Sequence, residues 1–264
     1  MKKITLLFSL LLLSSCQGAP SPWLDSSWQQ RADSIGRDVV ERNGFASDLF
    51  IVIVDSSGHH IVESRTHSGD LGMTADFPDP HPGSLLFPML LATVDSLDTT
   101  SYLPVGYHVF NSIPVVDDHA LGHDSLPTLQ ALAQGSKVAA VEFCHRHYGH
   151  RREELRRRLS EWLPGQSLPK DLADECNFVR LCTGDFLVAP EALLEAYRKL
   201  MLSRPDIVGD TGMTSTYVHE GGSVTGLFVG HDGHGHTCLV VAEGCTTHTG
   251  SLMEDIASNI FKNH

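Results

Sequence analysis

The order of the expected strands is the feature that most restricts how this chain can fold. Two short strand-like runs lie near its beginning, at 49–54 and 59–65, and three lie near its end, at 208–214, 224–230 and 237–243. Runs of this length, bounded by Gly, Asp and Ser, are typical of strands. Mostly helical patterns separate the two groups, so the pattern predicts one sheet built from both ends of the chain.

Helical spacing of apolar residues accounts for most of the remaining chain. The first such segment has Trp28, Ala32, Ile35 and Val39 on one face and ends at Gly44, a typical C-terminal cap. The expected helices span 26–43, 84–97, 128–148, 151–162, 191–201 and 251–262. The predicted fold class is α+β, with a mainly antiparallel sheet flanked by terminal helices on one side and an inserted helical subdomain on the other.

The first residues predict export. Lys2 and Lys3 precede an apolar run, Ile4 to Leu13, which has the length of a signal peptide and is too short to span a bilayer. The following Leu13-Ser14-Ser15-Cys16 resembles the lipobox of bacterial lipoproteins, in which the chain is cut before the cysteine and the cysteine is acylated.

This resemblance implies three segments. Residues 1–15 form the signal peptide, 16–23 the lipidated Cys16 with a short tether, and 24–264 the folded domain. Several acyl chains give a stable membrane anchor. The residue after the cysteine is Gln17 and not an acidic residue. In the lipoprotein sorting rule, this favours the outer membrane. The expected location is therefore the cell envelope, facing the periplasm.

Charge and cysteine content exclude several classes of partner. Removing residues 1–15 removes two lysines and no acids, which changes the formal net charge from −13 to −15. A chain this acidic is a poor nucleic-acid binder. No Cys-x-x-Cys pair is present, so we expect no structural zinc and no cofactor. Five cysteines follow Cys16, and Cys176 and Cys182 are the closest pair that an oxidising compartment could join.

Several motifs, in order, resemble those of one enzyme family. Pro82-Gly83-Ser84-Leu85-Leu86-Phe87-Pro88 resembles the Pro-Gly-Ser-x-x-Lys-Pro segment of penicillin-binding proteins, with Phe87 at the lysine position. Gly135-Ser136-Lys137 stands where Ser-x-Asn is expected, and Gly209 to Thr214 resembles Gly-Lys-Thr-Gly-Thr. Together with flanking landmarks, the resemblance covers nearly all of residues 24–262. It implies the transpeptidase domain of the serine DD-transpeptidase and β-lactamase-like superfamily.

The resemblance also shows what this chain lacks. In the family, a serine at a helix N-terminus forms an acyl-enzyme, and a lysine three residues later takes its proton. Ser84 is the matching nucleophile position, but Phe87 cannot accept a proton, and losing a general base costs on the order of 10²–10⁴ in rate. Gly135 removes the hydroxyl of the second motif, and Lys137 replaces its amide.

The third motif inverts a charge. Asp210 stands where the family places a lysine that receives the substrate carboxylate, while Thr211 and Gly212 are expected to keep the strand geometry. A peptide ending in a carboxylate, or a β-lactam that mimics it, should therefore be repelled. Since the motifs converge in the family fold, Lys137 and Asp210 could also form an ion pair in the former substrate site.

The leading hypothesis is a pseudoenzyme, a catalytically impaired lipoprotein that keeps the fold as a binding or scaffolding module linked to peptidoglycan. Peptidoglycan peptides or cell-wall synthesis proteins are its expected partners, besides the membrane reached through Cys16. The alternative is a weak serine DD-transpeptidase or carboxypeptidase that uses Ser84, with Lys137 as a relocated base. A third hypothesis, metal handling by His231, His234 and His236, competes with the expectation that these residues form a polar hairpin turn. His81, just before the Ser84 motif, is expected to be a solvated loop residue.

Overall fold

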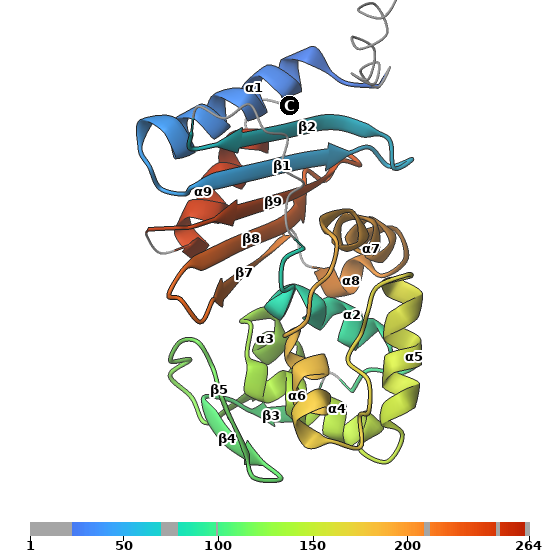
Figure 1. Cartoon of the computed structure of the whole chain (residues 1–264). Helices are drawn as coiled ribbons and strands as arrows, with labels where there is room; N and C mark the ends of the chain where they lie inside the picture. The colour runs from blue at the N-terminus through green and yellow to red at the C-terminus, as the bar shows by residue number, and fades with distance from the viewer. Residues whose placement is uncertain (1–22, 70–78, 99, 209–211, 247–248, 262–264) are drawn as a thin grey trace, which may run out of the picture.

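A five-stranded antiparallel sheet, built from both ends of the chain, forms one half of the molecule (Figure 1). The computed structural model describes residues 23–69, 79–98, 100–208, 212–246 and 249–261. The strand order is β2-β1-β9-β8-β7. The bounds are β1 Asp48–Val54, β2 His60–His67, β7 Gly212–Val218, β8 Val224–His231 and β9 Thr237–Glu243. The predicted α+β fold class is confirmed.

The two ends of the chain meet where β1 pairs with β9. Ile51 lies opposite Val240, and Ile53 lies opposite Cys238. After Asp48 every residue of β1 is buried, which agrees with a central strand covered on both faces. One face packs against α1, Ser26–Gly36, which continues as a π-helical stretch, and against α9, Thr249–Phe261 (Figure 1).

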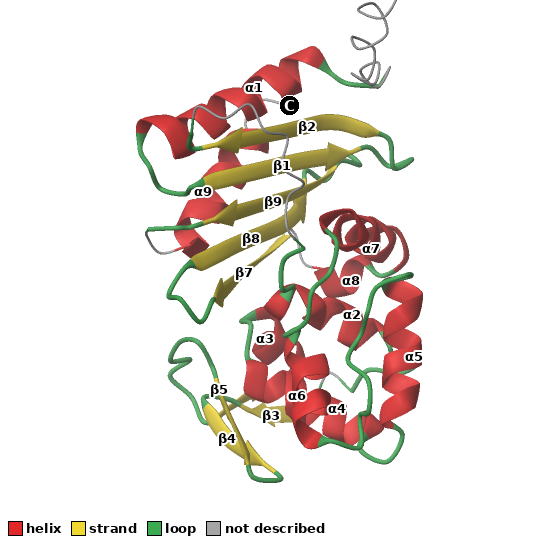
Figure 2. Cartoon of the chain, in the orientation of Figure 1, coloured by secondary structure: helices red, strands yellow, loops and turns green. Residues whose placement is uncertain are grey.

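The other face of the sheet packs against the helical subdomain (Figure 2). Its helices are α2 Phe87–Ala92, α3 Thr128–Ala133, α4 Lys137–Tyr148, α5 Arg152–Trp162, α6 Glu175–Thr183, α7 Pro190–Ser203 and α8 Pro205–Val208. Two small two-stranded sheets lie beside them: β3 Tyr102–Pro104 with β6 Ser125–Pro127, and β4 Tyr107–Phe110 with β5 Ile113–Val116. Within the described ranges, no helix combines the length and the apolar character needed to cross a membrane.

Several predicted bounds were wrong. The helix expected over 128–148 is two helices, α3 and α4, with Gly135 between them at φ 76°. The helix expected over 84–97 begins as a 3-10 turn, Gly83–Leu86, and its α-helical part ends at Ala92. Of the strand expected over 208–214, Val208 instead ends the short helix α8, which Pro205 starts, and β7 is described from Gly212, since 209–211 lie outside the described residues. Helix α6 was not predicted, although Asp174 caps its first turn and Gly184 ends it in the left-handed conformation.

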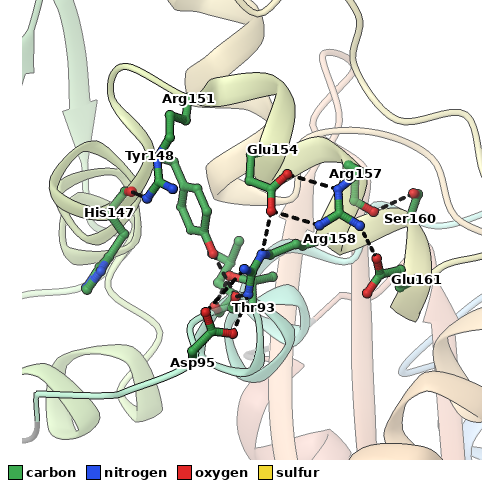
Figure 3. Close-up of polar contacts among 11 residues, drawn as sticks. Thr93, Asp95, His147, Tyr148, Arg151, Glu154, Arg157, Arg158, Ser160 and Glu161 are labelled. Atoms are coloured by element: carbon green, nitrogen blue, oxygen red, sulfur yellow. Dashed lines mark hydrogen bonds and ion pairs between the residues drawn. The ribbon is translucent and has the colours of Figure 1, made fainter.

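Helix α5 anchors the end of α2, the helix that follows Ser84 (Figure 3). The Thr93 carbonyl, at the end of α2, accepts hydrogen bonds from Tyr148 Oη at 2.7 Å and from Arg158 Nη1 at 2.6 Å. Arg158 also pairs with Asp95 at 2.8 Å and with Glu154 at 2.8 Å. Hydrogen bonds from Arg157 and Arg158 lower the pKa of Glu154 to about 2. Much of the positive charge of this helix is therefore neutralised within the fold.

Candidate functional site

The segments that carry the three motif positions line one cleft between the sheet and the helical subdomain. Its volume is about 460 Å³, and its lining includes Ser84, Gly135 and Gly212. Strand β7 forms one wall, from Gly212 to Thr216, and the loop after β5 contributes Asp118 and His119. Asp210 and Thr211, like Cys16, lie outside the described residues.

Close backbone contacts hold the turn that carries Ser84. The Gly83 N–H donates to the Gly184 carbonyl at 3.2 Å. A Cβ at Gly184 would lie 2.5 Å from the Gly83 oxygen, and the backbone at Gly184 has φ +73°. Both the space and the left-handed conformation therefore demand glycine at the end of α6.

Gly212 has the same role at the start of β7. Its φ is +130°, and a Cβ there would lie 2.3 Å from the Val229 oxygen of the neighbouring strand. The expectation that Gly212 keeps the strand geometry agrees with this contact. The other wall is set by Gly135, where an added Cβ would lie 3.5 Å from the Ser84 Cβ. The second-motif position therefore lies directly beside the first.

Both polar groups of Ser84 are bonded to β7. Its hydroxyl donates to the Thr214 carbonyl at 2.9 Å, and its backbone N–H donates to Ser215 Oγ at 3.2 Å. A carbonyl oxygen cannot take up the serine proton. The N–H at this helix start is the type of donor that stabilises an oxyanion, and here a neighbouring hydroxyl occupies it.

Phe87 lies one turn after Ser84 and points into the core. Its side chain is fully buried in the main hydrophobic cluster, next to an apolar cavity of about 340 Å³ lined also by Leu91, Leu129 and Leu132. The position of the family's lysine has therefore become part of the packing. No Lys, Arg or His side chain hydrogen bonds to Ser84 in the part of the chain that the structure describes.

Lys137 is the first residue of α4, and its ammonium donates to Asp118 Oδ1 at 2.6 Å. Its side chain is 30% exposed and that of Asp118 is 52% exposed. The predicted ion pair with Asp210 falls partly outside the described residues and stays a prediction. The relocated-base hypothesis also stays a prediction, but the contact that the structure gives Lys137 is with a carboxylate.

Asp117, which was not predicted from the sequence, organises this side of the cleft. Its carboxylate accepts hydrogen bonds from Ser136 Oγ at 2.8 Å, from the Val138 N–H at 3.0 Å and from the Gly106 N–H at 2.6 Å. These bonds join the loop after β5 to the start of α4, which fixes the segment Gly135–Lys137. The only signal in the sequence was an acidic pair directly after the apolar run 113–116.

His81 is not the solvated loop residue that was expected. Its ring stacks on Tyr217 of β7 with centroids 3.8 Å apart, and its Nδ1 lies 3.1 Å from Asp185 Oδ1. Burial lowers the pKa of His81 below its usual value, although the Asp185 carboxylate opposes this. The stack holds the loop before Ser84 against the sheet.

The histidine-rich segment is a hairpin turn organised by Asp232. Asp232 Oδ1 accepts the His234 and His236 N–H groups at 2.7 and 3.1 Å, and Oδ2 bonds His236 Nδ1 at 2.5 Å. Across the described ranges, no three His, Cys, Asp or Glu side chains are grouped to hold a metal ion. Cys176 and Cys182 are not joined; both lie on α6, the first exposed and the second buried.

No protein-family model and no curated protein sequence matches the chain. Solved structures do. A peptidoglycan glycosyltransferase from Burkholderia ambifaria is 15% identical with a TM-score of 0.66, over 90% of this chain and 94% of that one. The transpeptidase domain of Burkholderia pseudomallei penicillin-binding protein 3 is 14% identical with a TM-score of 0.69, over 90% of this chain and 93% of that one. A Legionella pneumophila D,D-transpeptidase domain is 17% identical with a TM-score of 0.66, over 90% of this chain and 96% of that one.

Proposed function

We propose, on the premise that the chain has the transpeptidase fold of penicillin-binding proteins, that it is a catalytically impaired relative and acts as a binding or scaffolding module of the cell envelope. Its partners in this proposal are peptidoglycan peptides or cell-wall synthesis proteins. The cleft around Ser84 serves as a recognition site in which no acyl-enzyme forms.

The state of Ser84 is the observation that carries this proposal. A serine nucleophile needs a base for its proton and free N–H donors for the oxyanion. Here the hydroxyl bonds the Thr214 carbonyl at 2.9 Å, and the N–H bonds Ser215 Oγ at 3.2 Å. With Phe87 in the core, the absence of the general base alone predicts a loss on the order of 10²–10⁴ in rate.

The charges around the cleft also support the loss of the family reaction. Asp118 and Glu254 are the acidic residues of the lining, no Lys or Arg of the described chain lines the cleft, and the Lys137 ammonium pairs with Asp118 from beside it. Because Lys137 offsets the charge of Asp118, the repulsion of an anionic ligand comes mainly from Glu254. Two like charges about 4 Å apart repel by on the order of 4 kcal/mol at an effective dielectric near 20. A ligand that ends in a carboxylate is therefore a poor fit.

Anchoring through Cys16 completes the proposal and rests on the sequence. The lipobox-like Leu13-Ser14-Ser15-Cys16 supports a lipid anchor, and Gln17 supports the outer membrane. We expect the wild-type protein in the membrane fraction and the Cys16→Ala variant to be released or to remain unprocessed. A Cys16→Ala variant that is processed and membrane-bound like the wild type would contradict lipid anchoring.

Covalent labelling with a fluorescent penicillin tests the central claim. We expect no adduct by intact mass on the wild-type domain, on Ser84→Ala or on Lys137→Met, each shown to be folded by circular dichroism. An adduct on the wild type that is absent from Ser84→Ala would overturn the pseudoenzyme proposal. Loss of that adduct in Lys137→Met would then identify Lys137 as the relocated base.

A further inference from the structure

Exposed apolar side chains are concentrated in one short stretch of the chain. Nine large apolar side chains are exposed in the described ranges, and four of them lie between residues 102 and 116. Three belong to the β4–β5 hairpin: Tyr107 is 62% exposed, Val109 47% and Val116 56%. Scattered exposed apolar residues are normal, whereas a group of this kind marks an interaction surface.

The strand register places these side chains on one face of the hairpin. Tyr107 pairs with Val116, and Val109 pairs with Pro114. Paired residues of antiparallel strands share a face, so Tyr107, Val109, Pro114 and Val116 form one apolar surface, called here the outer hairpin face. The opposite face carries Phe110 and Val115, which are buried in the core.

The hairpin is held rigidly on its inner side. Asn111 and Ser112 form its turn with φ 45° and 74°, and the Asn111 amide donates to Glu175 Oε2 at 2.9 Å. Phe110 stacks on His145 of α4 with centroids 5.4 Å apart. A surface fixed in this way loses little conformational entropy on binding.

The outer hairpin face ends two residues before the cleft lining begins. Val116 is followed by Asp117, which bonds Ser136, and by Asp118, which lines the cleft beside Ser84. Strands β4 and β5 pair only with each other among the described residues, so the hairpin also offers unpaired edges. Such edges accept an additional strand.

Charge distinguishes the possible occupants. The hairpin from Tyr107 to Val116 contains no Lys, Arg, Asp or Glu. The cleft carries Glu254 and Asp118, and Asp118 stays 52% exposed although it pairs with Lys137. A second copy of this chain, with a formal net charge of −13, would bring like charge to the same place. A partner segment with apolar and basic residues complements both parts.

We infer that the outer hairpin face and the adjoining cleft rim bind an extended segment of a partner protein. The apolar side chains of that segment pack on Tyr107, Val109 and Val116. Its Lys or Arg side chains face Glu254 and the exposed side of Asp118, the carboxylate that also pairs with Lys137. This inference rests on the proposed binding function and names the class of its partner, a basic and apolar polypeptide strand.

Selection from a phage-displayed library of random linear peptides on the full chain tests the inference. We expect the enriched peptides to combine alternating apolar residues with Lys or Arg. Their synthetic versions should bind Val116→Lys and Tyr107→Lys at least about tenfold more weakly than the wild type. Leu202→Lys is the matched control, since Leu202 is 65% exposed on α7, and its binding should be unchanged.

Four results would overturn the inference: no enrichment, enrichment of acidic peptides, equal binding to Val116→Lys and the wild type, or a wild-type dimer in sedimentation that Val116→Lys dissociates. The last result would assign the face to a second copy. Penicillin labelling reports on the proposed function independently, so an unlabelled protein whose hairpin binds nothing would leave the pseudoenzyme proposal intact and remove only this partner surface.

Discussion

The glycines around Ser84 and the residues at the reactive positions of the transpeptidase motifs differ. The glycines keep the backbone close-packed, whereas the reactive positions carry residues that cannot do the family's chemistry. Gly184 and Gly212 lie so close to neighbouring backbone atoms that no Cβ fits, and a Cβ at Gly83 would lie 2.3 Å from Ser215 Oγ. Phe87 and Lys137, at positions that carry chemistry in the transpeptidase motifs, lie in the core and against Asp118. The difference teaches that the fold depends on the glycines and tolerates the loss of the reactive groups.

Replacing Phe87 should give the largest effect and shows whether the former lysine position is now structural. We expect Phe87→Ala to lower the free energy of unfolding by about 3–5 kcal/mol, because a fully buried aromatic side chain is removed from the main core. Urea denaturation followed by circular dichroism measures it. A loss under about 1 kcal/mol would show that the position is not part of the packing.

Gly184→Ala tests the backbone contact itself. The added Cβ meets the Gly83 backbone at 2.5 Å, and φ is +73°, so we expect a loss of about 2–4 kcal/mol. Gly165→Ala is the control, because φ there is +77° but no atom lies within 4 Å of the added Cβ. It should lose only about 1–2 kcal/mol, and equal losses would remove the argument from close contact.

The stack of His81 on Tyr217 predicts a pH dependence at the edge of the site. Since burial lowers the pKa of His81, the unfolded chain binds a proton that the folded chain does not. Stability should therefore fall as the pH drops below about 6.5, the usual pKa of histidine. Between pH 7 and pH 5, the free energy of unfolding of His81→Phe should change less with pH than that of the wild type. The pH dependence that remains comes in part from His147, whose pKa is also lowered by burial.

The Lys137–Asp118 pair should give the smallest effect. Both side chains are partly exposed, so a double-mutant cycle with Lys137→Met and Asp118→Asn should give a coupling of about 0–1 kcal/mol. A larger coupling would mean that the pair holds the cleft wall together. In that case Lys137 would belong with the glycines as a structural residue.

The strands and the three motif segments could be predicted from the sequence because each is a local pattern. The hydrophobic runs 49–54 and 237–243 alone indicate buried strands. Ser84 is identified by the Pro82-Gly83 before it and Pro88 after it, which match the family's motif. The β4–β5 hairpin was missed because its turn is Asn111-Ser112, a weaker signal than Asn-Gly. Asp117 was missed because its partners, Gly106, Ser136 and Val138, come from separate parts of the chain and meet only in three dimensions.

The pairing of β1 with β9 has a consequence for the order of folding. The β1–β2 hairpin is synthesised early, but the strand that completes β1 is among the last parts of the chain to appear. Until then β1 presents an unpaired apolar edge, which is the kind of edge that aggregates. Contacts this distant in sequence also slow folding. The nascent chain should therefore depend on chaperones, and truncation before Thr237 should leave an insoluble product.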